Sequence, residues 1–318
     1  MKNIVFMGTP DFAVKSLQAL LDQPDYQVVA VVTQPDRPVG RKRRLTPTPV
    51  KEVALAHDLK IFQPEHIASD QEIADFFDQA ELDLLVTAAY GQFLPQSLLE
   101  APKYGAVNVH ASLLPKYRGG APIHYAIWKG DQETGVSLMQ MVPAMDAGPI
   151  LAQAKASIDD QVTVAEMFDR LADLGAELLI DKLPALFAGD LQAVPQDEDQ
   201  ATYAPNIKKA EERIDWTEPA QAIHNKIRAF NSWPGAYALY EDQRWKFWRT
   251  EVLADQTTDQ APGTVIGIKK KPAQFLIAAG DGKVLNVLEI QPNGKKQMDS
   301  ASFINGGAGH IDVNDRFE

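Results

Sequence analysis

The 318-residue sequence contains no cysteine. This absence excludes disulfide bonds, thiolate-bound zinc and a cysteine nucleophile, and it fits a protein of a reducing compartment. The sequence also lacks a G-x-x-x-x-G-K-S/T phosphate-binding loop, an H-E-x-x-H pair, and a G-x-G-x-x-G after its first apolar run. It therefore gives no indication of ATP or GTP chemistry, of a metal site or of a nicotinamide-dependent dehydrogenase.

Long hydrophobic runs are also missing. The first residues, MKNIVFMGTPDF, are apolar for only a short stretch and lack a small-residue cleavage site, so we expect no signal peptide. The most apolar later stretch, LDLLVTAAYGQFL (82–94), is too short and too interrupted to span a bilayer. We therefore expect a soluble, cytoplasmic protein, and the length suggests two domains.

Positive charge is scarce, since 31 Lys and Arg stand against 43 Asp and Glu. The imbalance lies in residues 1–208, which hold 17 against 28, whereas residues 209–318 hold 14 against 15. A polyanionic partner would therefore have to meet a local basic cluster. The densest cluster is RPVGRKRRLTP (37–47). It is typical either of a solvated surface loop or of an arm that contacts phosphates without reading their sequence.

Strand-like and helical patterns alternate in the first part of the chain. Strand-like runs occur at 3–8, 26–35, 60–64, 82–91 and 104–112, and helical spacing of apolar residues occurs at 11–23, 50–59, 70–80 and 162–189. The second strand is β-branched and apolar on both faces, as interior parallel strands are. The alternation predicts an α/β fold with a doubly wound, mostly parallel sheet, whose ligands lie beyond the carboxyl ends of the strands.

The pattern changes after residue 189. Residues 190–208 are polar, contain proline and show little periodicity, which is typical of a linker. A short helical pattern at 218–230 is followed by closely spaced strands with Gly or Pro turns, which predict a small β-barrel. The predicted organisation is therefore a catalytic domain at 1–189, a linker at 190–208 and a C-terminal β-barrel domain at 209–318.

Asn108 and His110 lie two residues apart in the strand-like run YGAVNVHAS (104–112). Side chains at this spacing share one face of a strand. The amide can donate to a developing oxyanion, and the imidazole can transfer a proton near neutral pH. The alternative is a structural pair, in which the amide caps a turn and the imidazole is hydrogen-bonded in the core.

Asp146 lies in VPAMDAGPI (142–150), after another strand-like run. On its own, Asp-Ala-Gly-Pro indicates no more than a turn. Asp146 has a functional interpretation only if the fold brings it back to His110, where its carboxylate would orient the ring and stabilise the imidazolium.

These blocks together resemble the folate-dependent formyltransferases. The resemblance rests on NVHASLLPKYRGGAPI (108–123) and MDAGPI (145–150), and it extends to FMGTPDFA (6–13), LTPTPVK (45–51) and FNSWPGA (230–236). It covers nearly the whole chain. Within the family it is closest to the members that act on an aminoacyl-tRNA.

The resemblance implies transfer of a formyl group from 10-formyltetrahydrofolate to the α-amine of methionine carried by initiator tRNA, without a metal. It implies Asn108, His110 and Asp146 as catalytic residues. The matching positions for folate are Ser112, Leu113, Leu114, Pro115, Tyr90 and Gly91, and those for tRNA are Arg41, Lys42, Arg43 and Arg44. The C-terminal β-barrel, of the oligonucleotide-binding type, would grip the tRNA body, and we expect a monomer.

Other functions remain open at this point. A related enzyme could formylate an amino-sugar nucleotide or another small amine, although the basic cluster at 41–44 argues against that acceptor. The family members that act on glycinamide ribonucleotide typically lack a C-terminal barrel. A hydrolase that releases formate and a catalytically inactive RNA-binding protein are further alternatives, which the reaction product and a His110→Ala variant would distinguish.

Overall fold

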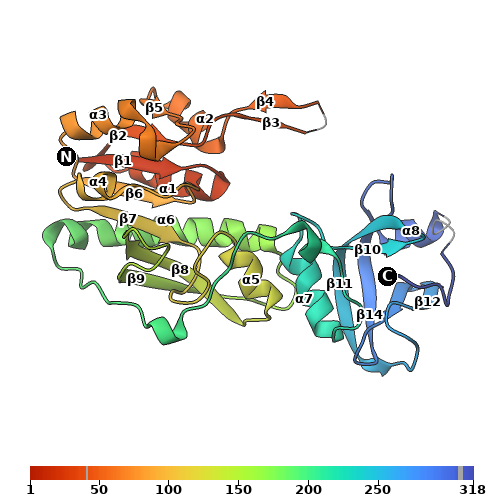
Figure 1. Cartoon of the computed structure of the whole chain (residues 1–318). Helices are drawn as coiled ribbons and strands as arrows, with labels where there is room; N and C mark the ends of the chain where they lie inside the picture. Colours follow the sequence, from red (N-terminus) through yellow and green to blue (C-terminus); the bar gives the residue numbers. More distant parts are fainter. Residues whose placement is uncertain (41, 307–310) are drawn as a thin grey trace. The chain divides into compact units, whose positions relative to one another are not determined.

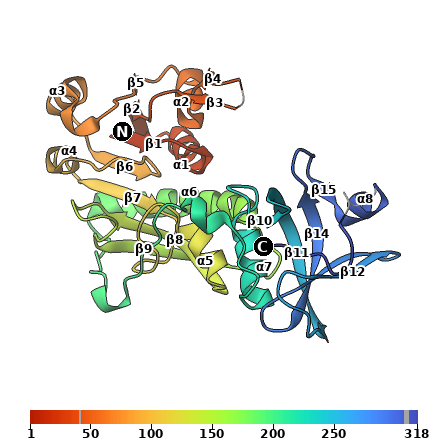
Figure 2. The same cartoon turned by 45° about the vertical axis from the view of Figure 1, so that its right-hand side comes forward.

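The computed structural model describes residues 1–40, 42–306 and 311–318, which divide into two compact units (Figures 1 and 2). The first unit comprises Met1–Pro122, Glu133–Ser157 and Phe168–Pro205, and the second comprises Ile123–Gln132, Ile158–Met167 and Asn206–Glu318. The division into 1–189, 190–208 and 209–318 stays a prediction. No helix within the described ranges is long and apolar enough to cross a membrane.

The first unit is built on a sheet in which seven described strands follow the order β5-β2-β1-β6-β7-β8-β9. The strands are β1 (Lys2–Gly8), β2 (Tyr26–Val32), β5 (Ile61–Phe62), β6 (Leu84–Ala88), β7 (Ala106–His110), β8 (Glu133–Gln140) and β9 (Ile150–Ser157). The first five in this order run parallel, and β8 and β9 join antiparallel at one edge. The predicted doubly wound, mostly parallel sheet is therefore confirmed.

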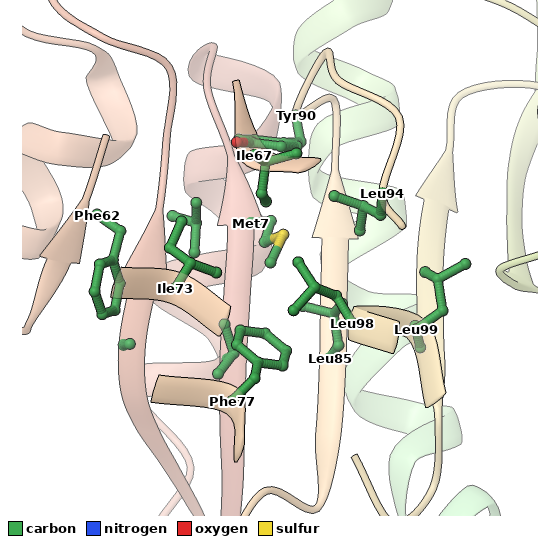
Figure 3. Close-up of a cluster of buried hydrophobic side chains, with 14 of the residues drawn as sticks. Met7, Phe62, Ile67, Ile73, Phe77, Leu85, Tyr90, Leu94, Leu98 and Leu99 are labelled. Atoms are coloured by element: carbon green, nitrogen blue, oxygen red, sulfur yellow. The ribbon is translucent and has the colours of Figure 1, made fainter. Parts of the chain in front are cut away.

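Helices pack on both faces of this sheet (Figure 1). They are α1 (Asp11–Leu21), α2 (Pro49–Ala56), α3 (Gln71–Gln79), α4 (Gln96–Glu100) and α6 (Val164–Ala188), with short 3-10 turns at Ile67–Ser69 and Glu198–Gln200. On one face, Met7 of β1 and Leu85 of β6 lie in a buried cluster with side chains of α3 and α4 (Figure 3). On the other face, a Cβ at Gly8 would lie 2.6 Å from the Cβ of Ala13, so glycine lets α1 pack closely on β1.

The strand order reverses between β1 and β6. Strands β2 and β5 lie on one side of β1, while β6 and β7 follow on the other. In parallel sheets, ligands bind beyond the carboxyl ends of the strands at such a switch point. The carboxyl ends of β1, β6 and β7 carry Gly8, Ala88 and His110, so the predicted catalytic strand β7 ends beside the switch point.

Strand β9 is absent from the sequence-based prediction. Its sequence, ILAQAKAS, alternates alanine with polar residues, and its residues are half-buried or exposed. This weak pattern suits an edge strand, which needs little apolar surface. Pairing with β8 therefore determines its conformation.

Two short strands within the basic cluster pair with each other as a β-hairpin. Strands β3 (Arg37–Val39) and β4 (Arg44–Thr46) pair antiparallel and project from the first unit (Figure 1). The base of the hairpin is fixed by Asp36, which accepts a hydrogen bond from Lys51 at 2.8 Å and one from Gln63 at 2.7 Å. The Lys51 ammonium holds the pKa of the Asp36 carboxyl below its usual value.

The second unit contains an antiparallel sheet in the order β10-β11-β14-β13-β12, with β15 paired to β14. Its strands are β10 (Tyr237–Tyr240), β11 (Gln243–Thr257), β12 (Val265–Lys270), β13 (Ala273–Ala278), β14 (Lys283–Gln291) and β15 (Met298–Asp299). Its helices are α7 (Ala220–Ala229), α8 (Ser300–Asn305), a 3-10 turn at Lys209–Glu212, and most of α5 (Pro122–Trp128). The sequence predicts a small C-terminal β-barrel, and the antiparallel sheet of this unit confirms a β domain at this end of the chain.

The end of the chain connects the two edge strands of this sheet. Leu239 of β10 exchanges backbone hydrogen bonds of 3.0 and 2.8 Å with Glu318, and Val265 of β12 donates to Asp315 at 2.8 Å. Phe317 is buried between these contacts and packs against the ring of Phe247 at 5.2 Å. The C-terminal residues thereby close the sheet around an aromatic core.

Candidate active site

Strand β7 carries Asn108 and His110 in the interior of the sheet. Thr87 of β6 is the parallel partner of Asn108, and Ser137 of β8 is the antiparallel partner of His110. His110 is the last residue of β7 and is 6% exposed. Both side chains point to the same face of the sheet, as the alternation of strand residues requires.

The side-chain amide of Asn108 is held in one orientation. The hydroxyl of Thr87 donates to Asn108 Oδ1 at 2.8 Å. No hydrogen bond from Asn108 Nδ2 occurs among the residues that the structure describes. The amide therefore presents its N–H donors while its oxygen is engaged, which is the arrangement that stabilisation of an oxyanion requires.

The imidazole of His110 lies between a carbonyl and a carboxylate. His110 Nε2 is 3.1 Å from the carbonyl oxygen of Tyr117. Since a carbonyl only accepts, Nε2 carries the hydrogen, and in the neutral ring Nδ1 carries the lone pair. Nδ1 is 3.8 Å from Asp146 Oδ1, which is too long for a direct hydrogen bond. A proton taken up at Nδ1 would lie beside the negative charge of Asp146.

The fold brings Asp146 to His110, although 36 positions of sequence separate them. Its Oδ2 accepts a hydrogen bond of 2.8 Å from the backbone N–H of Gly119. Asp146 has a φ of +50°, a left-handed conformation that is unfavourable for a residue with a Cβ. Such strain persists only where neighbouring contacts impose it.

The segment after β7, which the resemblance assigns to folate, is mostly engaged inside the protein. Ser112 is fully buried, and its hydroxyl donates to the carbonyl of Lys116 at 2.6 Å. Leu114 is 3% exposed, and its N–H donates to Ser137 Oγ at 3.0 Å. Leu113 and Pro115 are half-buried. These residues fix the shape of the segment, so only the half-buried pair and backbone atoms remain for a ligand.

Tyr90 and Gly91 follow β6 at the switch point. The Tyr90 ring belongs to the hydrophobic cluster of Figure 3, and burial raises the pKa of its hydroxyl. Its carbonyl accepts hydrogen bonds from Thr9 Oγ1 at 3.1 Å and from Gln34 Nε2 at 3.2 Å. Gly91 is exposed with a φ of +92°. The Tyr90 side chain is thus part of the core, while Gly91 is accessible.

Of the predicted tRNA-contacting residues, Lys42, Arg43 and Arg44 lie at the exposed end of the β3–β4 hairpin. No ion pair in the described part of the chain involves their side chains. Arg41 lies outside the described residues. The hairpin therefore presents cations that no described carboxylate neutralises.

Sequence reasoning missed a set of residues that surrounds Asp146. Gln196 and Thr202 belong to the predicted linker, yet both lie in the first unit and hydrogen-bond to its other segments. Gln196 Nε2 donates to the carbonyl of Asp146 at 2.8 Å, and Thr202 Oγ1 accepts from the Tyr117 N–H at 2.9 Å. A polar segment without periodicity gives no signal for such contacts. Arg118 stands in the quoted KYRGG block, but nothing in the pattern distinguished it.

Within residues 1–40, 42–306 and 311–318, no group of three or more His, Asp or Glu side chains is arranged to hold a metal ion. The chemistry that the described residues can perform is hydrogen bonding to a carbonyl oxygen by Asn108 and proton transfer at His110. Both functions are required when an amine attacks an acyl carbon.

Comparison with known proteins gives two family matches. Residues 1–183 match the model of the formyl transferase family, and residues 206–308 match the model of the formyl transferase C-terminal domain. The methionyl-tRNA formyltransferase of Enterococcus faecalis is 51% identical over 318 residues, which cover 100% of both chains. The methionyl-tRNA formyltransferase of Pediococcus pentosaceus is 51% identical over 306 residues, 96% of this chain and 94% of that protein.

A solved structure shares the fold at low identity. The N-formyltransferase of Helicobacter canadensis, in complex with folinic acid and dTDP-3-aminofucose, superimposes with a TM-score of 0.67 at 19% identity. The match covers 92% of this chain and 100% of that one.

Proposed function

The chain belongs to the formyl transferase family, and on this basis we propose that it transfers the formyl group of 10-formyltetrahydrofolate to the α-amine of methionyl-initiator tRNA. The observation that carries the proposal is the 51% identity, over the full length of both chains, to a methionyl-tRNA formyltransferase. The product would be formylmethionyl-tRNA for translation initiation.

The catalytic roles follow from the geometry around β7. As the amine adds to the formyl carbon, negative charge develops on the carbonyl oxygen, and the N–H of Asn108 donates to it. His110 Nδ1 takes the proton that the amine nitrogen loses and returns it to the departing nitrogen. The carboxylate of Asp146, 3.8 Å from Nδ1, stabilises the imidazolium between these two transfers.

The residues near the switch point fit a flat heterocycle such as a pterin. Exposed apolar side chains stand on the loops that follow β6 and β8, namely Phe93, Val142 and Met145. A pterin ring needs apolar contact on its faces and hydrogen bonds at its edge. The donor supplies the activated acyl carbon, and the half-buried Leu113 and Pro115, with Gly91, are the residues of this chain that would hold it.

The β3–β4 hairpin supplies the contact with the acceptor. Lys42, Arg43 and Arg44 are exposed, in a unit whose charge is otherwise negative. Contacts between such cations and phosphates are independent of sequence and depend on salt. Together with Arg41, they would bind the acceptor arm, while the C-terminal domain would bind the tRNA body.

A formylation assay with two acceptors tests the proposal. The protein is incubated with 10-formyltetrahydrofolate and either methionyl-initiator tRNA or methionyl-elongator tRNA, and formylmethionine is measured after hydrolysis of the ester. We expect formylation of the initiator tRNA and little of the elongator tRNA. Transfer to an amino-sugar nucleotide instead would replace the proposal with the alternative acceptor, and release of free formate would indicate a hydrolase.

A further inference from the structure

Three consecutive residues of the first unit connect the candidate catalytic groups. The carbonyl of Tyr117 accepts the hydrogen bond of His110 Nε2, and the N–H of Gly119 donates to Asp146 Oδ2. Arg118 lies between them. The position of this short segment therefore determines where both the imidazole and the carboxylate lie.

The segment itself is anchored by the Arg118 side chain. Arg118 is 3% exposed, although it carries a full charge. Its Nη1 and Nη2 donate to the two carboxylate oxygens of Glu198 at 2.9 and 2.8 Å, and its Nε and Nη2 donate to Gln196 Oε1 at 3.0 and 2.9 Å. Because the guanidinium is planar and its N–H groups point in fixed directions, these hydrogen bonds hold the Arg118 side chain in one orientation. The Arg118 charge in turn holds the pKa of the Glu198 carboxyl below its usual value.

Gln196 connects this anchor to the loop of Asp146. Its Nε2 donates to the carbonyl of Asp146 at 2.8 Å and to that of Gly148 at 2.7 Å, while its oxygen accepts from Arg118. The amide is therefore fixed at both ends. Gln196 is half-buried, whereas residues 192–195 and 197–200 are exposed, although the exposed Glu198 also contacts Arg118.

The backbone adopts left-handed conformations both in the Asp146 loop and in the Tyr117–Gly119 segment. Asp146 has a φ of +50° and Tyr117 a φ of +62°. At Gly119, with a φ of +119°, a Cβ would lie 2.8 Å from the carbonyl oxygen of Ala204. Left-handed residues persist only where surrounding contacts over-determine them, and Gln196 supplies two such contacts to the Asp146 loop.

We propose that Arg118, Gln196 and Glu198 form a brace that positions Asp146 against His110, with Gln196 as the positioning residue of the reaction. The expected effect on kcat rests on the proposed function, whereas the positioning of Asp146 by the brace does not depend on which acceptor is formylated. The Gln196 side chain hydrogen-bonds to Arg118 and to the backbone of the Asp146 loop. It acts by holding the backbone of Asp146, and thus the 3.8 Å approach of Asp146 Oδ1 to His110 Nδ1.

Steady-state kinetics of three variants test the brace. Gln196→Ala removes all four hydrogen bonds, Gln196→Glu keeps an acceptor for Arg118 but loses the donors to the Asp146 loop, and Gln200→Ala is the matched control. Gln200 lies in the same segment, and among the described residues its side chain donates to Asp197 alone. We expect kcat to fall about 10- to 100-fold in both Gln196 variants, as misplaced catalytic groups do. KM should change less than about twofold, and Gln200→Ala should match the wild type.

A nitrogen NMR measurement of the histidine rings tests the brace without any substrate. The His110 signals are identified among the six histidines by their loss in His110→Gln. In Gln196→Ala and Gln196→Glu, the Nδ1 resonance that faces Asp146 should move, and the Nε2 resonance held by Tyr117 should stay. If Gln196→Ala does not fold, Glu198→Gln, changed at an exposed side chain, should give a smaller movement of the same sign.

The outcomes separate the brace from the proposed function. An unmoved Nδ1 resonance, a kcat of Gln196→Ala equal to that of Gln200→Ala, or full recovery of kcat in Gln196→Glu would overturn the brace. A wild-type protein that fails to formylate methionyl-tRNA would overturn the proposed function, and the NMR measurement would still decide the brace.

Discussion

Each unit buries a histidine beside an aspartate, and the two pairs differ in what else the rings contact. His110 of the first unit and His224 of the second are 6% and 2% exposed. Their ring nitrogens lie 3.8 and 3.9 Å from carboxylate oxygens of Asp146 and Asp160. His224, however, binds Thr250 Oγ1 through Nδ1 at 2.9 Å and the carbonyl of Asp160 through Nε2 at 2.7 Å. Both of its nitrogens are hydrogen-bonded, whereas Nδ1 of His110 has no direct hydrogen bond to any residue that the structure describes.

The same difference separates the asparagines. Asn286 of β14 accepts from the N–H of Phe275 at 3.1 Å and donates to Glu251 at 2.7 Å. Within the described ranges, the Asn108 side chain is hydrogen-bonded only through its oxygen, by Thr87. Burial or proximity to an acid therefore does not identify a reactive side chain. A reactive side chain has one polar atom fixed by the protein and another left for the substrate.

We expect the largest loss of kcat when His110 and His224 are each replaced in a separate variant. His110→Gln should lower kcat about 10³-fold, within the range for loss of a general acid–base, while the thermal unfolding midpoint changes little. His224→Gln should leave kcat near the wild-type value at 25 °C. Formylation rates measured at saturating substrates check both variants. Equal losses of kcat in the two variants would remove the distinction between the rings.

We expect the same contrast between Asn108 and Asn286, with a smaller loss of kcat than for the histidines. Asn108→Ala removes the donor to the developing oxyanion and should lower kcat about 10²-fold. Asn286→Ala leaves the buried Phe275 N–H and Glu251 without their partner and should lower the free energy of unfolding by about 1–3 kcal/mol. Single-turnover rates and urea titrations of both variants provide the check. A slow reaction in Asn286→Ala with unchanged stability would contradict this assignment.

The parts of this molecule that were predictable from sequence are those with a strong local pattern. Strands β1, β2 and β6 are apolar on both faces, so their parallel pairing could be inferred. The N-x-H spacing on β7 is by itself enough to predict that Asn108 and His110 share one face of a strand. These features depend on neighbours in the sequence, and local propensity suffices for them.

The remainder depends on contacts between distant segments. Gln196 lies in a polar stretch whose only role in the pattern was to separate two domains, and its partners are 48 to 78 positions away. The 3.8 Å approach of Asp146 to His110 likewise follows from the pairing of β7 with β8. Hydrogen bonds made by side chains across loops leave no periodic signal, because any polar residue fits an exposed loop.

A buried and an exposed set of arginines differ in the same way, and this difference concerns the binding of tRNA. Arg228 of α7 is buried and donates to Asn225 Oδ1 and to two backbone carbonyls, whereas Arg43 and Arg44 are exposed. Replacing Arg43 and Arg44 together with alanine should raise the KM for tRNA about tenfold and reduce the slope of log affinity against log salt by about two. The KM for the folate should stay unchanged.

A charge-matched control accompanies this double variant. Replacing Lys15 and Lys155, two exposed cations of the first unit, with alanine removes the same net charge at sites that the proposal does not use. If the control raised the KM for tRNA equally, the hairpin arginines would contribute only through the net charge of the protein and not through local contacts with tRNA. Unchanged binding in the Arg43 and Arg44 variant would refute its role as a tRNA contact.

We expect the smallest effect on catalysis from low pH acting on the second unit. Its effect should instead be seen in the free energy of unfolding of that unit. Burial lowers the pKa of His224 and of His124 below the usual 6.5. Each binds its proton more readily in the unfolded chain, so stability is lost as pH falls below about 6.5, by up to about 1.4 kcal/mol per pH unit and histidine. His224→Gln should flatten this dependence. Urea unfolding of the second unit between pH 7.5 and pH 5 measures it, and identical slopes in wild type and variant would show that His224 is protonated equally in both states.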